Sequence, residues 1–78
     1  ESGLFDKPEH MKKMLKQFNL TKNSTVYIGD EPRDLEAARQ VGINSCAVSW
    51  GYSTVGRLKQ EKPTWLIDKP EQLLQIID

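Results

Sequence analysis

Apolar side chains recur at three- and four-residue spacing in the first part of the chain, which predicts an amphipathic helix. Pro8 opens this helix, since proline favours the first helical position. The apolar positions, which we expect to be core, are Met11, Met14, Leu15 and Phe18. Lys7 then becomes the capping residue, although a lysine side chain has no acceptor for the free amides. Lys7 is therefore either a solvated lysine or a cation that another part of the molecule requires.

Three short apolar runs predict β-strands at residues 25–28, 45–48 and 65–67. The first run is apolar on both faces, which is typical of a parallel strand covered on both sides. The third is short and is expected at an edge of the sheet. Residues 19–24 are polar and predict a connection without a helix or a strand.

Helix-forming segments separate these strands. One follows the first strand at residues 35–41 and ends at Gly42, and a shorter one is expected within residues 53–60. Asp68 and Glu71 have the spacing of a capping box before a last amphipathic helix. The apolar positions of that helix are Leu73, Leu74, Ile76 and Ile77.

The alternation of helices and strands requires parallel strands with right-handed crossovers. The expected fold class is α/β: a three-layer, Rossmann-like partial core of about three parallel strands flanked by helices. The 78 residues allow one small domain, residues 1–78, near the lower limit for burying a core without disulfides or a structural metal. The chain begins at Glu1 rather than at methionine, so we provisionally expect a piece of a longer protein.

The balance of basic and acidic residues indicates which kinds of binding partner the sequence does not favour. Eleven basic and eleven acidic residues give zero net charge, so nothing favours nucleic acid or an anionic membrane. No apolar run is long enough to span a bilayer, and no secretion signal is recognisable. Cys46 is the single cysteine, which excludes an internal disulfide and a cysteine-based zinc site. We expect Cys46 to be buried and inert, and a reducing cytoplasm fits this composition.

The junction after the first strand carries the candidate chemistry. Gly29 and Asp30 follow that strand directly, and Asp34 falls in the first turn of the next helix if Pro32 is its first residue. Carboxylates in the crevice at this edge of a sheet repel each other unless a cation neutralises them, and magnesium prefers such oxygen ligands. The alternative is that Glu31 and Asp34 simply cap the helix, where acids are favourable whatever the function.

A second loop leaves from the same edge of the sheet after the strand at residues 45–48. Its aromatic residues, Trp50 and Tyr52, either form a wall of the crevice or pack beneath the loop. With Gly29 and Glu31 they are candidate residues of the site wall.

Four stretches in this order resemble the C-terminal half of a haloacid dehalogenase-like (HAD) hydrolase of the phosphoglycolate phosphatase-like kind. They are residues 5–8, residues 26–42, residues 48–52 and residues 63–74. The resemblance implies a magnesium-dependent phosphate monoester hydrolase with a Rossmann-like sheet. It implies that Lys7 offsets the charge of the nucleophile and the phosphoryl group. It also implies that Asp30 and Asp34 hold Mg²⁺ directly or through water.

The aspartate nucleophile of this family has no counterpart in the sequence. The aspartates are Asp6, Asp30, Asp34, Asp68 and Asp78, and none has another aspartate two residues away. The early phosphoryl-binding strand and the cap insertion are also missing, and with them the regions implied to set substrate specificity. We therefore expect a segment that is inactive alone and binds Mg²⁺ weakly or not at all, with a small phosphorylated substrate in the full-length parent.

The missing segment also predicts an open sheet edge. In the family, the strand that ends at Asp30 pairs on its other side with the nucleophile strand, so here that flank would be uncovered. Exposed edges invite pairing with another chain, so we expect a dimer mate or the missing N-terminal segment there. Two alternatives remain: a non-catalytic α/β module that binds a phosphate group or a protein, and an autonomous folding fragment without activity.

Overall fold

The computed structural model describes residues 7–51 and 53–77, except for the side chain of residue 77. In this part of the chain the strands are β1 (Val26–Gly29), β2 (Asn44–Val48) and β3 (Trp65–Ile67). They form one sheet in the order β1-β2-β3, and both strand pairs are parallel. The predicted parallel sheet is confirmed, with β3 at one edge.

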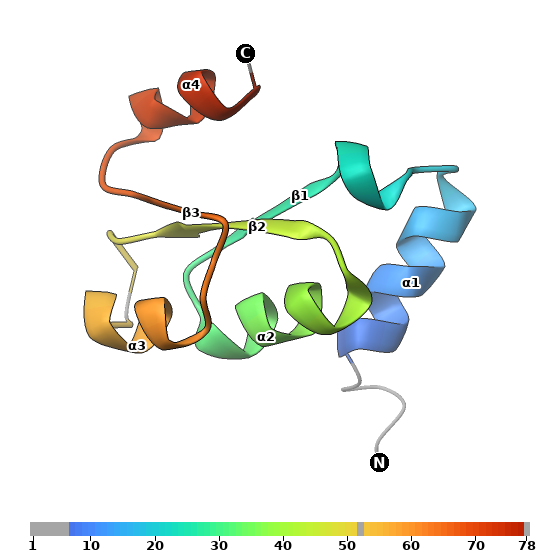
Figure 1. The fold of residues 1–78 in the computed structure, drawn as a ribbon, viewed down its shortest axis with the longest axis horizontal. Helices are drawn as coiled ribbons and strands as arrows, with labels where there is room; N and C mark the ends of the chain where they lie inside the picture. Colours follow the sequence, from blue (N-terminus) through green and yellow to red (C-terminus); the bar gives the residue numbers. More distant parts are fainter. Residues whose placement is uncertain (1–6, 52, 78) are drawn as a thin grey trace.

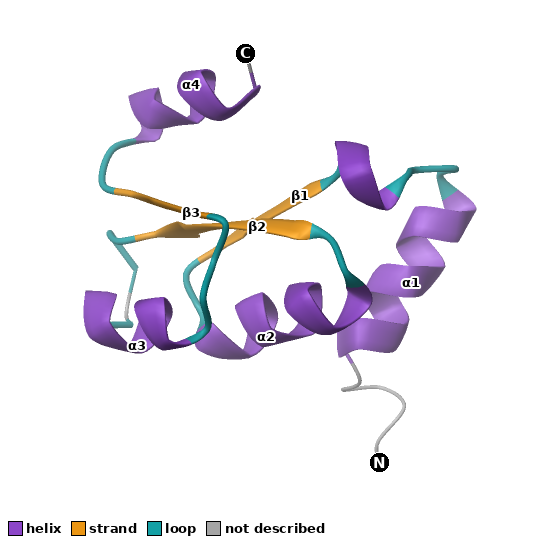
Figure 2. Cartoon of the chain, in the orientation of Figure 1, coloured by secondary structure: helices purple, strands orange, loops and turns teal. Residues whose placement is uncertain are grey.

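Helices cover both faces of this sheet. Four α-helices lie within the described residues: α1 (Lys7–Gln17), α2 (Pro32–Val41), α3 (Val55–Gln60) and α4 (Leu73–Ile77). The first three lie on one side of the sheet and α4 lies on the other (Figures 1 and 2). The expected three-layer α/β arrangement is therefore present. None of the helices in the described ranges is long and apolar enough to cross a membrane.

The core divides into clusters on the two faces, because successive strand residues point to opposite sides. On the α2 side, Leu35 and Leu58 pack against Ala47 of β2, and all three are fully buried. On the α4 side, Leu73 and Ile76 pack over a cluster that includes Cys46. Burial also raises the pKa of the Cys46 thiol, which agrees with the inert role expected for it.

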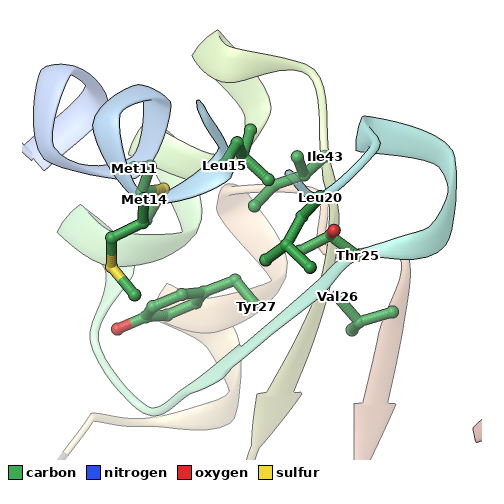
Figure 3. Close-up of a pocket in the computed structure, with 8 residues that line it drawn as sticks. All are labelled: Met11, Met14, Leu15, Leu20, Thr25, Val26, Tyr27 and Ile43. Carbon is green, nitrogen blue, oxygen red and sulfur yellow. The ribbon is translucent and has the colours of Figure 1, made fainter. Parts of the chain in front are cut away.

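Two expectations for α1 are wrong. Lys7 already lies within the helix, so it is not the capping residue. Leu15 is buried and Met11 is partly buried, but Met14 is 55% exposed and Phe18 is 58% exposed. The reason is geometric: α1 packs mainly beside α2, and its buried residue Leu15 belongs to one cluster with Ala38 and Val41 of that helix. Figure 3 shows Met14 over an apolar hollow of about 160 Å³ between α1 and β1.

β1 is not covered on both faces. Ile28 is 47% exposed, because the residues that α4 covers come mainly from β2 and β3. Among the described residues β1 pairs only with β2, so its other edge is open, as expected.

The capping box expected at Asp68 lies one residue further along the chain. The Oε1 atom of Gln72 accepts hydrogen bonds from the backbone N–H of Lys69 at 2.9 Å and of Asp68 at 2.6 Å. Lys69 is thus the capping position of a 3₁₀ turn at Pro70–Gln72 that leads into α4. Asp68 instead accepts a hydrogen bond from the Ser49 hydroxyl at 3.1 Å.

Three smaller findings concern the connections and α4. Leu74 is exposed rather than core. A 3₁₀ turn at Lys22–Ser24 occupies part of the connection expected to lack a helix. Gly42 ends α2 at a φ of 95°, a left-handed conformation that glycine adopts without strain, so the predicted stop is confirmed.

Candidate functional site

The turn from β1 into α2 places an acidic residue inside the molecule. Pro32 is the first residue of α2, so Asp34 lies in its first turn, as predicted. Glu31 occupies the capping position, but its side chain makes no capping hydrogen bond. The Asp34 carboxylate accepts its hydrogen bond from a side chain of β1. Hydrogen-bonded capping of α2 therefore does not explain why Glu31 and Asp34 occur at this turn.

Two side chains hold the carboxylate of Asp34. The Lys7 ammonium nitrogen lies 2.7 Å from Oδ1, and the Tyr27 hydroxyl donates a hydrogen bond of 2.8 Å to Oδ2. The Asp34 side chain is only 10% exposed, so this charge requires the neutralisation that Lys7 provides. The structure thus brings together two of the predicted site residues, Lys7 and Asp34, from the starts of α1 and α2.

Tyr27 is the residue that our sequence reasoning missed. We treated it only as part of an apolar strand, yet its ring lies against Gly29, where a β-carbon would come within 2.6 Å of its Cε2 atom. Burial, the hydrogen bond to Asp34 and the charges of Asp34, Glu31 and Asp30 raise the pKa of Tyr27. The phenol therefore stays protonated at neutral pH and remains a donor. Strand alternation indicates that Tyr27 lies on the opposite face of the sheet from Val26 and Ile28, but it does not indicate which group its hydroxyl contacts.

Asp30 lies where the β1 turn meets the loop after β2. It is partly buried, and a β-carbon at Gly51 would overlap its carboxyl group. This contact confirms that the two loops meet at the carboxyl edge of the sheet. Within the described residues the carboxylate of Asp30 makes no hydrogen bond or ion pair, and its Oδ2 atom lies against Gly51.

The donor set is compatible with Mg²⁺. This ion commonly uses one or two carboxylates, with water and a substrate phosphate completing its coordination. Asp30 offers an unpaired carboxylate, whereas both oxygens of Asp34 already contact other side chains. The described residues contain no group of three His, Cys, Asp or Glu side chains arranged to hold a metal ion, so these residues alone would not complete a site here.

The remaining candidates are less closely tied to this cluster. Trp50 is half-exposed. Tyr52 lies outside the described residues, as do Phe5 and Asp6 of the first resembling stretch. His10 is exposed and lies on the rim of a small hollow that Lys7 and Asp34 also line.

The fold and the acidic turn agree with a known class of enzymes. The family model of the haloacid dehalogenase-like hydrolases matches residues 4–48, which is more than half of the chain. The chain belongs to this family. The resemblance proposed from the sequence motifs is therefore confirmed.

The names of related proteins indicate which activities occur in this family. The phosphoglycolate phosphatase of Synechococcus elongatus is 46% identical over 54 residues, which is 69% of this chain and 26% of the relative. The pyrophosphatase PpaX of Bacillus mycoides is 30% identical over 70 residues, which is 90% of this chain and 33% of the relative. The chain thus spans about a quarter to a third of the length of these relatives.

Solved structures show the same arrangement of elements. A haloacid dehalogenase-like family hydrolase from Streptococcus pneumoniae matches with a TM-score of 0.84 at 25% sequence identity. The match covers 91% of this chain and 34% of that structure. The fold of these residues is therefore that of one part of a HAD-like core.

Proposed function

We propose that this chain supplies the magnesium-binding and charge-balancing part of a phosphate monoester hydrolase, with phosphoglycolate phosphatase-like chemistry. The observation that carries this proposal is the 2.7 Å contact between Lys7 and Asp34, at the same sheet edge as the unpaired carboxylate of Asp30. Phosphoryl transfer depends chiefly on positioning and on neutralising charge, and this edge offers a cation and hard oxygen donors. Relatives named as a phosphatase and a pyrophosphatase support the same class.

The residues take distinct roles in this proposal. Asp30 would hold Mg²⁺ directly, and Asp34 would act through water, because Lys7 and Tyr27 already engage both of its oxygens. When bound, the ion neutralises phosphoryl charge. The ammonium of Lys7 offsets further charge on the nucleophile and the phosphoryl group, and Tyr27 fixes the orientation of Asp34.

These 78 residues contain no Asp-x-Asp pair, so we propose that they do not turn over phosphate esters alone. A small phosphorylated compound would be the substrate of the longer parent protein, in a reducing cytoplasm. The open edge of β1 would be covered there by an N-terminal segment that carries the nucleophile, or otherwise by a dimer mate.

Magnesium titration of the ¹⁵N-labelled chain tests the proposal. We expect weak binding, with amide shifts confined to Lys7, Asp30, Asp34 and their neighbours. Asp30→Asn removes the proposed direct ligand and should abolish these shifts. Glu71→Gln is the matched control, because it removes a carboxylate from an exposed turn after β3, and it should leave the titration unchanged.

Four outcomes would contradict the proposal. Unchanged magnesium shifts in Asp30→Asn would exclude the assigned ligand, and the absence of any shift would favour an autonomous folding piece. Shifts around Trp50 with an organic phosphate, without a magnesium response at Asp30, would favour a non-catalytic binding module. Hydrolysis of an aryl phosphate by the chain alone, abolished by Asp30→Asn, would disprove the proposed lack of activity.

A further inference from the structure

The buried carboxylate of Asp34 has two contacts of different kinds. Its Oδ2 atom accepts a hydrogen bond of 2.8 Å from the Tyr27 hydroxyl. Its Oδ1 atom lies 2.7 Å from the Lys7 ammonium nitrogen but has no hydrogen-bond partner among the described residues. The contact with Lys7 is therefore an ion pair without a directional bond. The hydrogen bond from Tyr27 is the contact that orients the Asp34 side chain.

The orientation of Asp34 depends on this hydrogen bond. A carboxylate rotates about its last bond with only broad preferences. The attraction between opposite charges depends on their separation, so Lys7 alone does not fix this rotation. The Asp34 side chain is only 10% exposed, so water is poorly placed to replace the phenol hydroxyl. Loss of that hydroxyl should leave Oδ2 unsatisfied and the carboxylate free to turn.

Tyr27 is itself held firmly. Its ring lies against Gly29, where a β-carbon would come within 2.6 Å of the ring atom Cε2. The ring also packs on the buried cluster that contains Leu15 of α1 and Val41 of α2. A tyrosine side chain has only two rotatable bonds before its ring. Packing of this ring therefore places the hydroxyl at a defined position beside Asp34.

Lys7 depends on its partner instead. Its side chain is 40% exposed, and a lysine carries its charge on a flexible four-carbon stem. Among the described residues, this side chain makes no ion pair or hydrogen bond except the contact with Asp34. Exposed ion pairs contribute little unless their geometry is held. The position of the Lys7 ammonium therefore follows the orientation of Asp34.

We propose that Tyr27 is a positioning residue for the Lys7 ammonium and that it acts through Asp34. The two contacts join β1, α2 and α1 in one chain of interactions. The inference rests on the proposed function, in which Lys7 offsets charge on the nucleophile and the phosphoryl group. It adds that a hydroxyl on the strand before the acidic turn fixes this cation before any substrate binds.

NMR relaxation of the ¹⁵N-labelled lysine side chains tests this inference, because an order parameter reports how rigidly a group is held. The measurement is made with EDTA, so that no metal contributes. In the parent chain we expect a higher order parameter for the Lys7 ammonium than for that of Lys13, which is exposed on the same helix. Equal values would overturn the inference without any variant.

Tyr27→Phe removes the hydroxyl but keeps the ring and its packing. The order parameter of the Lys7 ammonium should then fall to about the value of Lys13. An unchanged value in this variant would overturn the inference, because Lys7 would then be held without the phenol.

Asp34→Asn tests whether Tyr27 acts through Asp34. This variant removes the negative charge that attracts Lys7 while the Tyr27 hydroxyl remains. The order parameter of the Lys7 ammonium should fall as it does in Tyr27→Phe. A Lys7 ammonium that stays ordered in Asp34→Asn would overturn the inference, because the intermediate residue would not be needed.

Thr54→Ala is the control for a general loss of stability, because Thr54 caps α3 and contacts none of the three side chains. It should destabilise the chain and leave the order parameter of Lys7 unchanged. An equal fall in this variant would overturn the inference. Because magnesium is absent from these experiments, their outcome is independent of the magnesium titration. Failure of Tyr27 as a positioning residue can therefore be told apart from failure of the proposed function.

Discussion

At the scale of single residues, Asp34 shows how neighbouring side chains stabilise a buried carboxylate. Its partners come from two other elements, Lys7 from α1 and Tyr27 from β1. Lys7 and Asp34 could be singled out from the sequence, because a lysine at a helix start and an acid after a strand are local signals. Tyr27 could not, because a tyrosine in an apolar strand has the same pattern whether its hydroxyl meets a carboxylate or water.

Gly51 gives a prediction at this scale. A β-carbon at Gly51 would overlap the Asp30 carboxyl, so Gly51→Ala should displace that side chain. We expect the magnesium affinity of the chain to fall about 10- to 100-fold, the range found when groups that orient a ligand are altered. Titration followed by NMR measures this loss.

Gly56→Ala is the control for this change. A β-carbon at Gly56 meets no atom within 4 Å, so this variant should bind magnesium as the parent chain does. Equal affinity in the two alanine variants would show that the contact between Gly51 and Asp30 does not position a ligand.

At the scale of elements, the short helix α3 depends on its cap and on one buried side chain. The Oγ1 atom of Thr54 accepts a hydrogen bond of 3.2 Å from the backbone N–H of Arg57, and Leu58 is fully buried against α2 and β2. A helix of this length is unstable by itself, so tertiary packing maintains it. The sequence predicted a short helix within residues 53–60, but it did not identify Thr54 as the cap.

Thr54→Ala removes this cap. We expect the free energy of unfolding to fall by about 1 kcal/mol, as is typical for the loss of a capping side chain. Urea denaturation measures the change. Thr54→Ser retains the accepting oxygen and should stay close to the parent chain, and the explanation fails if serine and alanine are equally destabilising.

At the scale of the whole molecule, the sheet has a central strand and two edges. Cys46 and Ala47 of β2 pair with both neighbouring strands, whereas β1 pairs with β2 alone in the described residues. The exposed side chain of Ile28 lies on the same outer strand. The expectation that this flank is open came from the family resemblance, and the strand order agrees with it.

Hydrogen exchange tests this picture. In a demonstrated monomer, amides of β1 that point away from β2 should exchange at least about tenfold faster than those of Cys46 and Ala47 in β2, because no strand protects them. Mass spectrometry or NMR can follow the exchange. Uniformly slow exchange across both strands would contradict the open edge.

The sequence by itself determined the order of the elements, the parallel sheet, the stop at Gly42 and the acidic turn at Asp30 and Asp34. These features depend on local periodicity and on residue preferences within a few positions. Only the tertiary structure decided that Met14 and Phe18 are exposed and that Tyr27 and Lys7 hold Asp34. Such contacts join residues from different elements, so they depend on how the helices pack against the sheet, which local pattern does not specify.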